Sequence, residues 1–161
     1  MKYEIIDNFL DYLVFSKIKK AIHNNSSFPW YCIDGVSKKA IDDGIYFIHM
    51  FYDTSFQHSN YIDLINPIIS KINPKAIIRI KGNLYSKTET LQKHGWHEDF
   101  DFEHKGCIFY LNTNDGKTIL EDGTEIDSVE NRMLFFEPHI KHRSTNCTDE
   151  NSRVNINFNY F

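Results

Sequence analysis

The chain has 161 residues, a length that fits one domain able to fold without disulfide or metal support. Its hydrophobic content of 41% and charged content of 25% are typical of a globular protein. The net charge of -4 excludes a broad positive field, which argues against DNA or RNA as the partner. No linker-like stretch interrupts the composition, so we expect residues 1–161 to form a single domain.

The three cysteines are far apart and form no CxxC pair, which argues against a disulfide framework. The opening residues lack the pattern of a secretory signal, and no apolar run reaches the roughly 18 residues of a membrane span. We therefore expect a soluble protein in a reducing cytoplasm, with no membrane partner.

The N-terminal half predicts short strands and two amphipathic helices. A strand is expected at Tyr3–Phe9, and apolar residues then recur at helical spacing over Leu10–Ile22. Further strands are expected at Trp30–Val36 and Tyr46–Tyr52. A second helix is expected from about Tyr61 until the Asn73-Pro74 pair ends it.

After Pro74 the sequence reads as strands almost to its end. The segment 76–85 alternates, and its polar face consists of Arg79, Lys81, Asn83 and Tyr85. Such a strand is expected to turn its apolar face toward the helices and its polar face into a cavity.

The remaining strands are expected at 105–112, 117–120, 133–138 and 153–161, with turns at 113–116 and 121–123. Two helices followed by many short strands favour a mainly β fold with some α structure. We expect a jelly roll or β-sandwich that the N-terminal helices buttress.

The segment HGWHEDFDF at 94–102 contains a candidate pair of metal ligands. His97 and Asp99 are two residues apart, so on an extended strand both side chains project from one face. They would supply two ligands of a 2-His-1-carboxylate triad, which leaves coordination positions open for oxygenase chemistry. A His-x-Asp pair also occurs by chance at solvated strand ends, so the pair alone does not define a metal site.

The C-terminal segment 134–161 supplies the residues that this pair lacks. His142 follows an apolar strand and is the candidate third ligand. Arg153 comes eleven residues later, and its planar guanidinium suits bidentate binding of a carboxylate. Tyr110 is a candidate donor of a phenol hydrogen bond to the same carboxylate.

Six segments recur in the order and spacing of a known family. They are NLY (83–85), HGWHED (94–99), CIFYLN (107–112), GKT (116–118), RMLFFEPHIKH (132–142) and RVNINF (153–158). They resemble the 2-oxoglutarate/Fe(II) oxygenases of the prolyl-4-hydroxylase-like group, including small phage-encoded members. The resemblance runs from about Ile78 to the C-terminus and more loosely through the IIDNFL opening. It implies a double-stranded β-helix, a jelly-roll or cupin-like fold, with the metal at one end.

The resemblance implies a role for each matched residue. His97, Asp99 and His142 align with the metal ligands, and Arg153 aligns with the residue that binds the C5 carboxylate of 2-oxoglutarate. These four residues are therefore the candidate catalytic set.

Two tyrosines are candidate cofactor-binding residues. Tyr110 lies where the family often places a tyrosine beside the co-substrate carboxylate, and Tyr85 lies where a co-substrate contact is common. Each could equally be an ordinary core tyrosine.

The implied activity is that of a dioxygenase that uses Fe(II), 2-oxoglutarate and O2, with ascorbate as a supporting reductant. Decarboxylation of 2-oxoglutarate gives succinate and CO2, and the substrate gains a hydroxyl group. Asp99 favours hydroxylation, because related halogenases carry a small residue in place of this carboxylate. A phage-encoded member would act in the cytoplasm of its host.

A peptide or protein carrying a prolyl-like residue is the substrate that the resemblance favours first, and a free amino acid or other small metabolite is the alternative. Arg153 stands where collagen-type enzymes usually carry lysine, which puts collagen-like substrates in doubt. DNA-repairing relatives carry a second arginine just beyond the first, and none follows Arg153. A non-catalytic metal-binding β-sandwich and a zinc hydrolase are the competing classes.

Two other histidines compete for the metal. His139 competes with His142, which has the family's spacing to Arg153. His94 lies three residues before His97, so on a strand it would point elsewhere, and we expect it in a loop.

Neighbouring segments have open roles. Residues 86–96 are a candidate mobile lid beside the metal. Arg79 and Lys81 are predicted either to contact an acidic substrate or to reach solvent at the sheet edge.

Overall fold

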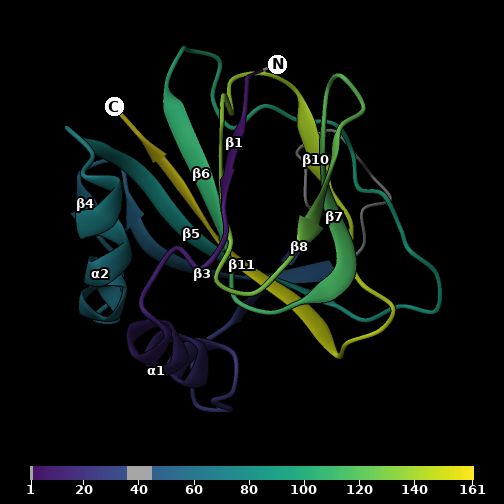
Figure 1. The fold of residues 1–161 in the computed structure, drawn as a ribbon, viewed down its shortest axis with the longest axis horizontal. Helices are drawn as coiled ribbons and strands as arrows, with labels where there is room; N and C mark the ends of the chain where they lie inside the picture. Colours follow the sequence, from purple (N-terminus) through teal and green to yellow (C-terminus); the bar gives the residue numbers. More distant parts are fainter. Residues whose placement is uncertain (1, 36–44) are drawn as a thin grey trace.

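The computed structural model describes residues 2–35 and 45–161 (Figure 1). The helices are α1 (Tyr12–Ile22) and α2 (Ile62–Ile72). The strands are β1 (Glu4–Ile6), β2 (Tyr31–Asp34), β3 (Ile45–Asp53), β4 (Phe56–Gln57), β5 (Ile77–Ser86), β6 (Lys105–Tyr110), β7 (Asn114–Leu120), β8 (Glu125–Ser128), β9 (Met133–Phe136), β10 (His142–Ser144) and β11 (Ser152–Tyr160).

The strands form one large and one small antiparallel sheet. The large sheet has the order β1-β9-β6-β11-β5-β3-β2, with β4 paired to β3, and the small sheet has the order β10-β7-β8. Both helices lie beside the large sheet, away from the strands of the small one (Figure 1). The predicted mainly β jelly roll with supporting helices is confirmed.

The main core lies between the helices and the large sheet. Phe15, Ile18 and Ile22 form the buried face of α1. The ring of Phe15 meets that of Phe109 on β6 edge to face, with centroids 6.0 Å apart. Leu13 was expected among the apolar positions of this helix, but it is 69% exposed. It belongs to the first turn, which begins at the Asp11 cap and lies outside the contact with the sheet.

Helix α2 ends where the sequence predicted. Asn73 adopts a left-handed conformation with φ 51°, and its backbone N–H donates to the carbonyl of Ile69. Ile65 and Ile68 are fully buried against the large sheet, as the amphipathic pattern indicated. No helix among residues 2–35 and 45–161 is long and apolar enough to cross a membrane.

Two parts of the strand prediction were wrong or incomplete, and a third is not tested. The turn expected at 113–116 lies mostly in β7, because Asn114 pairs with Ser128 of β8. Strands β8 and β10 have only four and three residues, too few for a visible alternation. In the strand expected at Trp30–Val36, Val36 lies outside the described residues.

The polar inner face of β5 was predicted correctly. Antiparallel pairing with β11 places Tyr85 opposite Arg153 and Asn83 opposite Asn155. The Asn83 amide donates a 3.0 Å hydrogen bond to the side-chain oxygen of Asn155. One face of this strand pair therefore carries a continuous row of polar side chains at the centre of the large sheet.

Candidate metal centre

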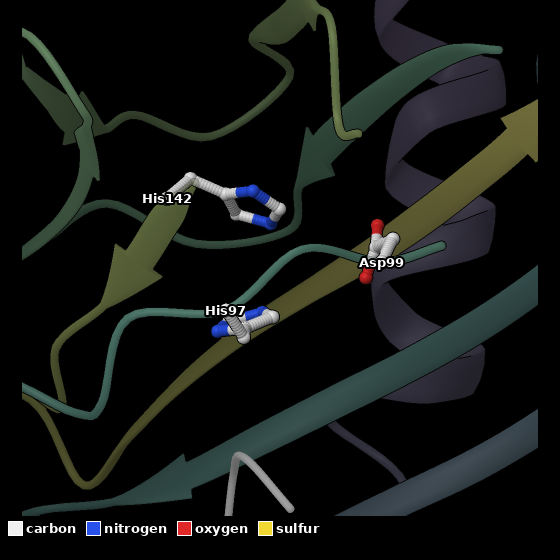
Figure 2. A group of neighbouring side chains, drawn as sticks. All are labelled: His97, Asp99 and His142. Atoms are coloured by element: carbon white, nitrogen blue, oxygen red, sulfur yellow. The ribbon is translucent and has the colours of Figure 1, made fainter. Parts of the chain in front are cut away.

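Three side chains from distant parts of the sequence converge on the inner face. His97, Asp99 and His142 each offer a ligand atom, and these atoms all lie within 4.8 Å of one another. Figure 2 shows His97 and Asp99 on the segment between β5 and β6 and His142 on β10. The spacing suits ligands that share one ion, because donors about 2 Å from a metal lie close to one another.

The segment that carries His97 is not the regular strand we expected. His97 forms only an isolated antiparallel bridge with His142. The two backbones exchange N–H···O bonds of 3.0 and 2.9 Å, and the Asp99 N–H donates to the Pro138 carbonyl at 2.9 Å. These hydrogen bonds fix the two histidines opposite each other, as pairing in a regular strand would.

Backbone carbonyls set which nitrogen of each ring faces the centre. Nδ1 of His97 lies 3.2 Å from the Gly95 carbonyl, and Nδ1 of His142 lies 3.0 Å from that of Ile140. A carbonyl only accepts, so in each neutral ring Nδ1 carries the hydrogen and Nε2 keeps its lone pair. The site therefore fits a metal that takes two imidazole nitrogens and one carboxylate oxygen.

The Asp99 carboxylate is held from two sides. Arg79 donates to Oδ1 at 2.8 Å and Asn157 donates to Oδ2 at 3.0 Å. Burial alone would raise the pKa of the Asp99 carboxyl, but the charges of His142, Arg79 and Lys81 outweigh it and lower the pKa. Asp99 is therefore an anion at neutral pH, ready to bind a cation. Arg79, predicted to contact an acidic substrate or to reach solvent, instead pairs with Asp99, although its side chain stays 17% exposed.

Burial disfavours the charged form of His97. Desolvation first, and the neighbouring His142 second, lower the pKa of His97 from 6.5 to about 4. The ring is consequently neutral at pH 7, the form that binds metals.

This pKa shift predicts a pH dependence of stability in metal-free protein. Between about pH 4 and 6.5 the unfolded chain holds a proton on His97 that the folded chain lacks, so the free energy of unfolding falls as the pH falls. The contribution is at most about 3 kcal/mol. Urea unfolding at pH 7 and 4.5 should therefore show a smaller decrease for His97→Gln than for the unsubstituted protein. Equal decreases would contradict the burial argument.

A pocket runs from the two histidines to Arg153. Its lining includes Tyr85, Thr118, Ser144 and Asn155. The Arg153 side chain is 1% exposed, so its charge is almost fully removed from water. A buried guanidinium without a carboxylate partner is costly, which makes the end of this pocket a site for an anionic ligand.

Neutral oxygens hold the Arg153 guanidinium in place. It donates to Ser128 Oγ at 2.7 Å, to the Thr145 carbonyl at 3.1 Å and to Thr118 Oγ1 at 2.9 Å. These bonds use three of its five N–H groups, so two remain for a ligand. None of these three residues was predicted to support Arg153: Ser128 and Thr118 lie on β8 and β7, Thr145 follows β10, and only the pairing in the small sheet brings them together.

The two candidate tyrosines lie in different places. Tyr85 lines the pocket and its ring lies 5.4 Å from the Arg153 guanidinium carbon. Tyr110 is fully buried, and its hydroxyl donates to Thr118 Oγ1 at 2.8 Å. Tyr110 is absent from the pocket lining, so in this structure it supports Thr118.

The other histidines lie away from the cluster. The His139 ring lies tilted beside that of His104, with ring centroids 6.2 Å apart, and His139 is not part of the ligand group. His94 lies outside the strands, as predicted, but it is 6% exposed and stacks on the Tyr85 ring at 5.1 Å.

The segment expected to form a lid is tied to the strand region opposite it. Lys87 bridges Cys147 and Lys93 bridges Thr145, both through backbone pairing. Any opening of residues 86–96 would have to break these pairs.

Gly116 leaves room for the guanidinium, which gives a second prediction. A Cβ atom at this position would lie 2.5 Å from the Asn146 carbonyl oxygen and closer still to Cδ of Arg153. We therefore expect Gly116→Ala to displace Arg153 and to weaken binding of a dicarboxylate by roughly tenfold or more, about 1.4 kcal/mol. Calorimetry with 2-oxoglutarate measures this.

Gly123 offers the control. It has φ 86° with no atom near its Cβ position, so Gly123→Asn, which tolerates this backbone conformation, should leave the affinity unchanged. Equal affinities of Gly116→Ala and the unsubstituted protein would contradict the packing argument.

No family model and no curated protein matches the sequence. Solved structures do match the fold. The viral collagen prolyl hydroxylase of Paramecium bursaria Chlorella virus-1, in complex with 2-oxoglutarate, has a TM-score of 0.62 at 15% identity, over 99% of this chain and 94% of that chain. The fold is that of the 2-oxoglutarate/Fe(II) oxygenases.

Two further structures show the range of this fold. A prolyl hydroxylase of Trichoplax adhaerens, in complex with a hypoxia-inducible-factor peptide fragment, has a TM-score of 0.68 at 16% identity, over 99% of this chain and 83% of that chain. The epimerase SnoN, in complex with Fe3+, α-ketoglutarate and nogalamycin RO, has a TM-score of 0.69 at 10% identity, over 99% of this chain and 78% of that chain. The prolyl-4-hydroxylase-like resemblance therefore agrees with the fold, while the fold itself hosts more than one reaction.

Proposed function

We propose that the protein is an Fe(II)- and 2-oxoglutarate-dependent dioxygenase that hydroxylates its substrate. One observation supports this above the others. Two imidazoles and a carboxylate converge at one end of a pocket whose other end is a buried guanidinium, Arg153, with two unused N–H groups. A structural metal site has no need of such a guanidinium, whereas a dicarboxylate co-substrate needs both ends.

Each residue has a separate task in this proposal. His97 and His142 hold ferrous iron through Nε2, and Asp99 holds it through a carboxylate oxygen. Bound iron supplies the activation of O2, which needs coordination positions that three protein ligands leave open.

The co-substrate is oriented by the rest of the pocket. The two unused N–H groups of Arg153 donate to the C5 carboxylate of 2-oxoglutarate as a fork. Tyr85 and Asn83 line the pocket between Arg153 and the metal ligands. They would contact and orient the carbon chain of the co-substrate. Asp99 remains fixed because Arg79 and Asn157 hold both of its oxygens.

For the substrate, we propose a peptidyl residue of the prolyl type. The support is the fold shared with a prolyl hydroxylase in complex with a peptide fragment. A free small metabolite is the second candidate, supported by the shared fold of an epimerase in complex with nogalamycin RO. We also propose a reducing cytoplasm as the compartment, which suits ferrous iron and agrees with the three free cysteines.

The test is a measurement of succinate formed from 2-oxoglutarate in the presence of ferrous iron, O2 and ascorbate. Mass spectrometry of proline-containing peptides and of a metabolite mixture then looks for a gain of one oxygen atom. We expect succinate above the level without iron. A zinc hydrolase or a non-catalytic metal-binding sandwich would form none, and this outcome would refute the proposal.

A further inference from the structure

Lys81 places a positive charge on the inner face beside the candidate metal centre. On β5 it alternates with Arg79, which contacts Asp99, and with Asn83, which lines the pocket. Lys81 pairs with Asn157 of β11 on one side and with Met50 of β3 on the other. Residues two apart on a strand share a face, so the Lys81 side chain projects from the same face as these neighbours.

No carboxylate of the described residues lies within ion-pair distance of this ammonium. Among residues 2–35 and 45–161, the Lys81 side chain makes no ion pair or hydrogen bond, and its Nζ lies 5.9 Å from the ring centroid of Tyr46. The nearby Asp99 is already engaged by Arg79 and Asn157. Desolvation first and the charge of Arg79 second lower the pKa of Lys81 to about 8, so the amine is still mainly charged at pH 7.

The position of Lys81 separates it from the co-substrate. The pocket that ends at Arg153 does not include Lys81 in its lining. The charge of Lys81 nevertheless acts on the candidate metal ligands, because it lowers the pKa of both His97 and Asp99. Lys81 therefore lies near the ligands but outside the part of the pocket that a co-substrate would fill.

Beyond Lys81 the inner face continues as an apolar floor. Ile48 and Met50 of β3 are half-buried, whereas His49 and Phe51 between and beyond them are buried on the opposite face. Tyr31 of β2 pairs with Ile48 and is 62% exposed. A partly exposed apolar floor that ends at a cation suits a ligand with an apolar body and a negative group.

We propose that this floor binds the substrate and that Lys81 anchors a carboxylate of the substrate close to the hydroxylated position. This inference rests on the proposed oxygenase function and narrows its substrate to acidic molecules. The carboxylate could be the acidic side chain of a peptide or the main-chain carboxylate of a free amino acid. Either would give the partly buried ammonium a counter-charge that the described residues do not supply.

Calorimetry with two pairs of probes tests the inference on protein loaded with zinc(II) and 2-oxoglutarate, which cannot turn over. The first pair is N-acetyl-aspartyl-proline amide and N-acetyl-asparaginyl-proline amide, which differ in one side-chain charge. The second pair is N-acetyl-proline and N-acetyl-prolinamide, which differ in the charge of the main-chain carboxylate. We expect the acidic member of one pair to bind at least about tenfold more tightly than its neutral partner. The pair that shows this preference identifies the source of the carboxylate.

The variants connect the preference to one residue. Lys81→Met should remove it and Lys81→Arg should keep most of it, because arginine keeps the charge. Lys93→Met is the matched control, since Lys93 is exposed and pairs with Glu125, and it should keep the preference unchanged.

Two results would overturn the inference: no preference in either pair, including no binding of any probe; or a preference that survives in Lys81→Met, whether or not this variant binds 2-oxoglutarate more weakly. The titration of 2-oxoglutarate itself keeps the two proposals apart. If 2-oxoglutarate fails to bind, the oxygenase proposal fails; if it binds and the probes show no preference, only the role of Lys81 fails.

Discussion

Replacement of His142 by alanine is expected to weaken ferrous-iron binding by at least about 100-fold and to reduce succinate formation to the background without enzyme. The reason is that one of three ligands is lost, and even changes behind the ligands of metal sites cost 10- to 100-fold in affinity. Anaerobic iron titration followed by calorimetry measures the affinity, and quantification of succinate measures the turnover.

The control for this variant is His139→Ala. His139 lies three residues away in the sequence, but it is not part of the ligand group. It should keep iron affinity and turnover within about twofold. Circular dichroism and urea unfolding show whether each variant still folds, which is needed because His142 is only 3% exposed. A folded His142→Ala variant that binds iron normally would remove this residue from the site.

Replacement of Arg153 by methionine is expected to raise the KM for 2-oxoglutarate by roughly 30-fold to 4,000-fold. Loss of one partner of a buried charged pair costs about 2 to 5 kcal/mol, and each 1.4 kcal/mol is tenfold in affinity. Steady-state kinetics with varied 2-oxoglutarate measures the effect. Iron affinity should change little, because Arg153 lies at the opposite end of the pocket from the ligands.

Two further variants, one conservative and one a control, help to interpret the result for Arg153→Met. Arg153→Lys keeps the charge but loses the planar fork, so we expect an intermediate KM. Arg132→Met serves as the matched control, because Arg132 pairs with the exposed Asp7 and lies outside the pocket lining. If Arg153→Met folds and shows an unchanged KM, the guanidinium does not bind the co-substrate.

The sequence was sufficient to predict the fold class and to nominate the residues that converge. Some of the patterns are local and can be recognised in the sequence without the fold. They are the two-residue spacing of His97 and Asp99 and the polar alternation around Lys81. The structure brings His97, Asp99 and His142 together, while their role as ligands stays a prediction. The choice of His142 over His139 rested on the spacing to Arg153 that the family resemblance implies.

Contacts across the sheet were not predictable. Arg79 was expected to meet a substrate or solvent, but it pairs with Asp99, because the segment after β5 folds back over this strand. The bonds of Arg153 to Ser128 and Thr118 depend on β7 and β8, and β8 is too short to show a periodic pattern. Tyr110 was expected beside the co-substrate, whereas its hydroxyl is taken up by Thr118.

The proposed function and the proposed role of Lys81 depend on different residues of the same inner face of the large sheet. Arg79 and Asn157 engage Asp99 and so keep it available as a ligand. Among the residues that the structure describes, Lys81 has no ion-pair partner, which makes it informative about the substrate. In these two proposals three binding tasks are separated along one surface: metal at the centre, co-substrate toward Arg153 and substrate toward β3.

The most direct test of the central claim is an anaerobic titration of the iron-loaded protein with 2-oxoglutarate, followed by visible absorption. Chelation of ferrous iron by the keto acid gives a charge-transfer band. We expect this band to saturate at one equivalent each of iron and 2-oxoglutarate and to be absent from His142→Ala. If the folded protein gives no band, or if His142→Ala gives one of equal strength, the three side chains do not hold the iron in the way proposed.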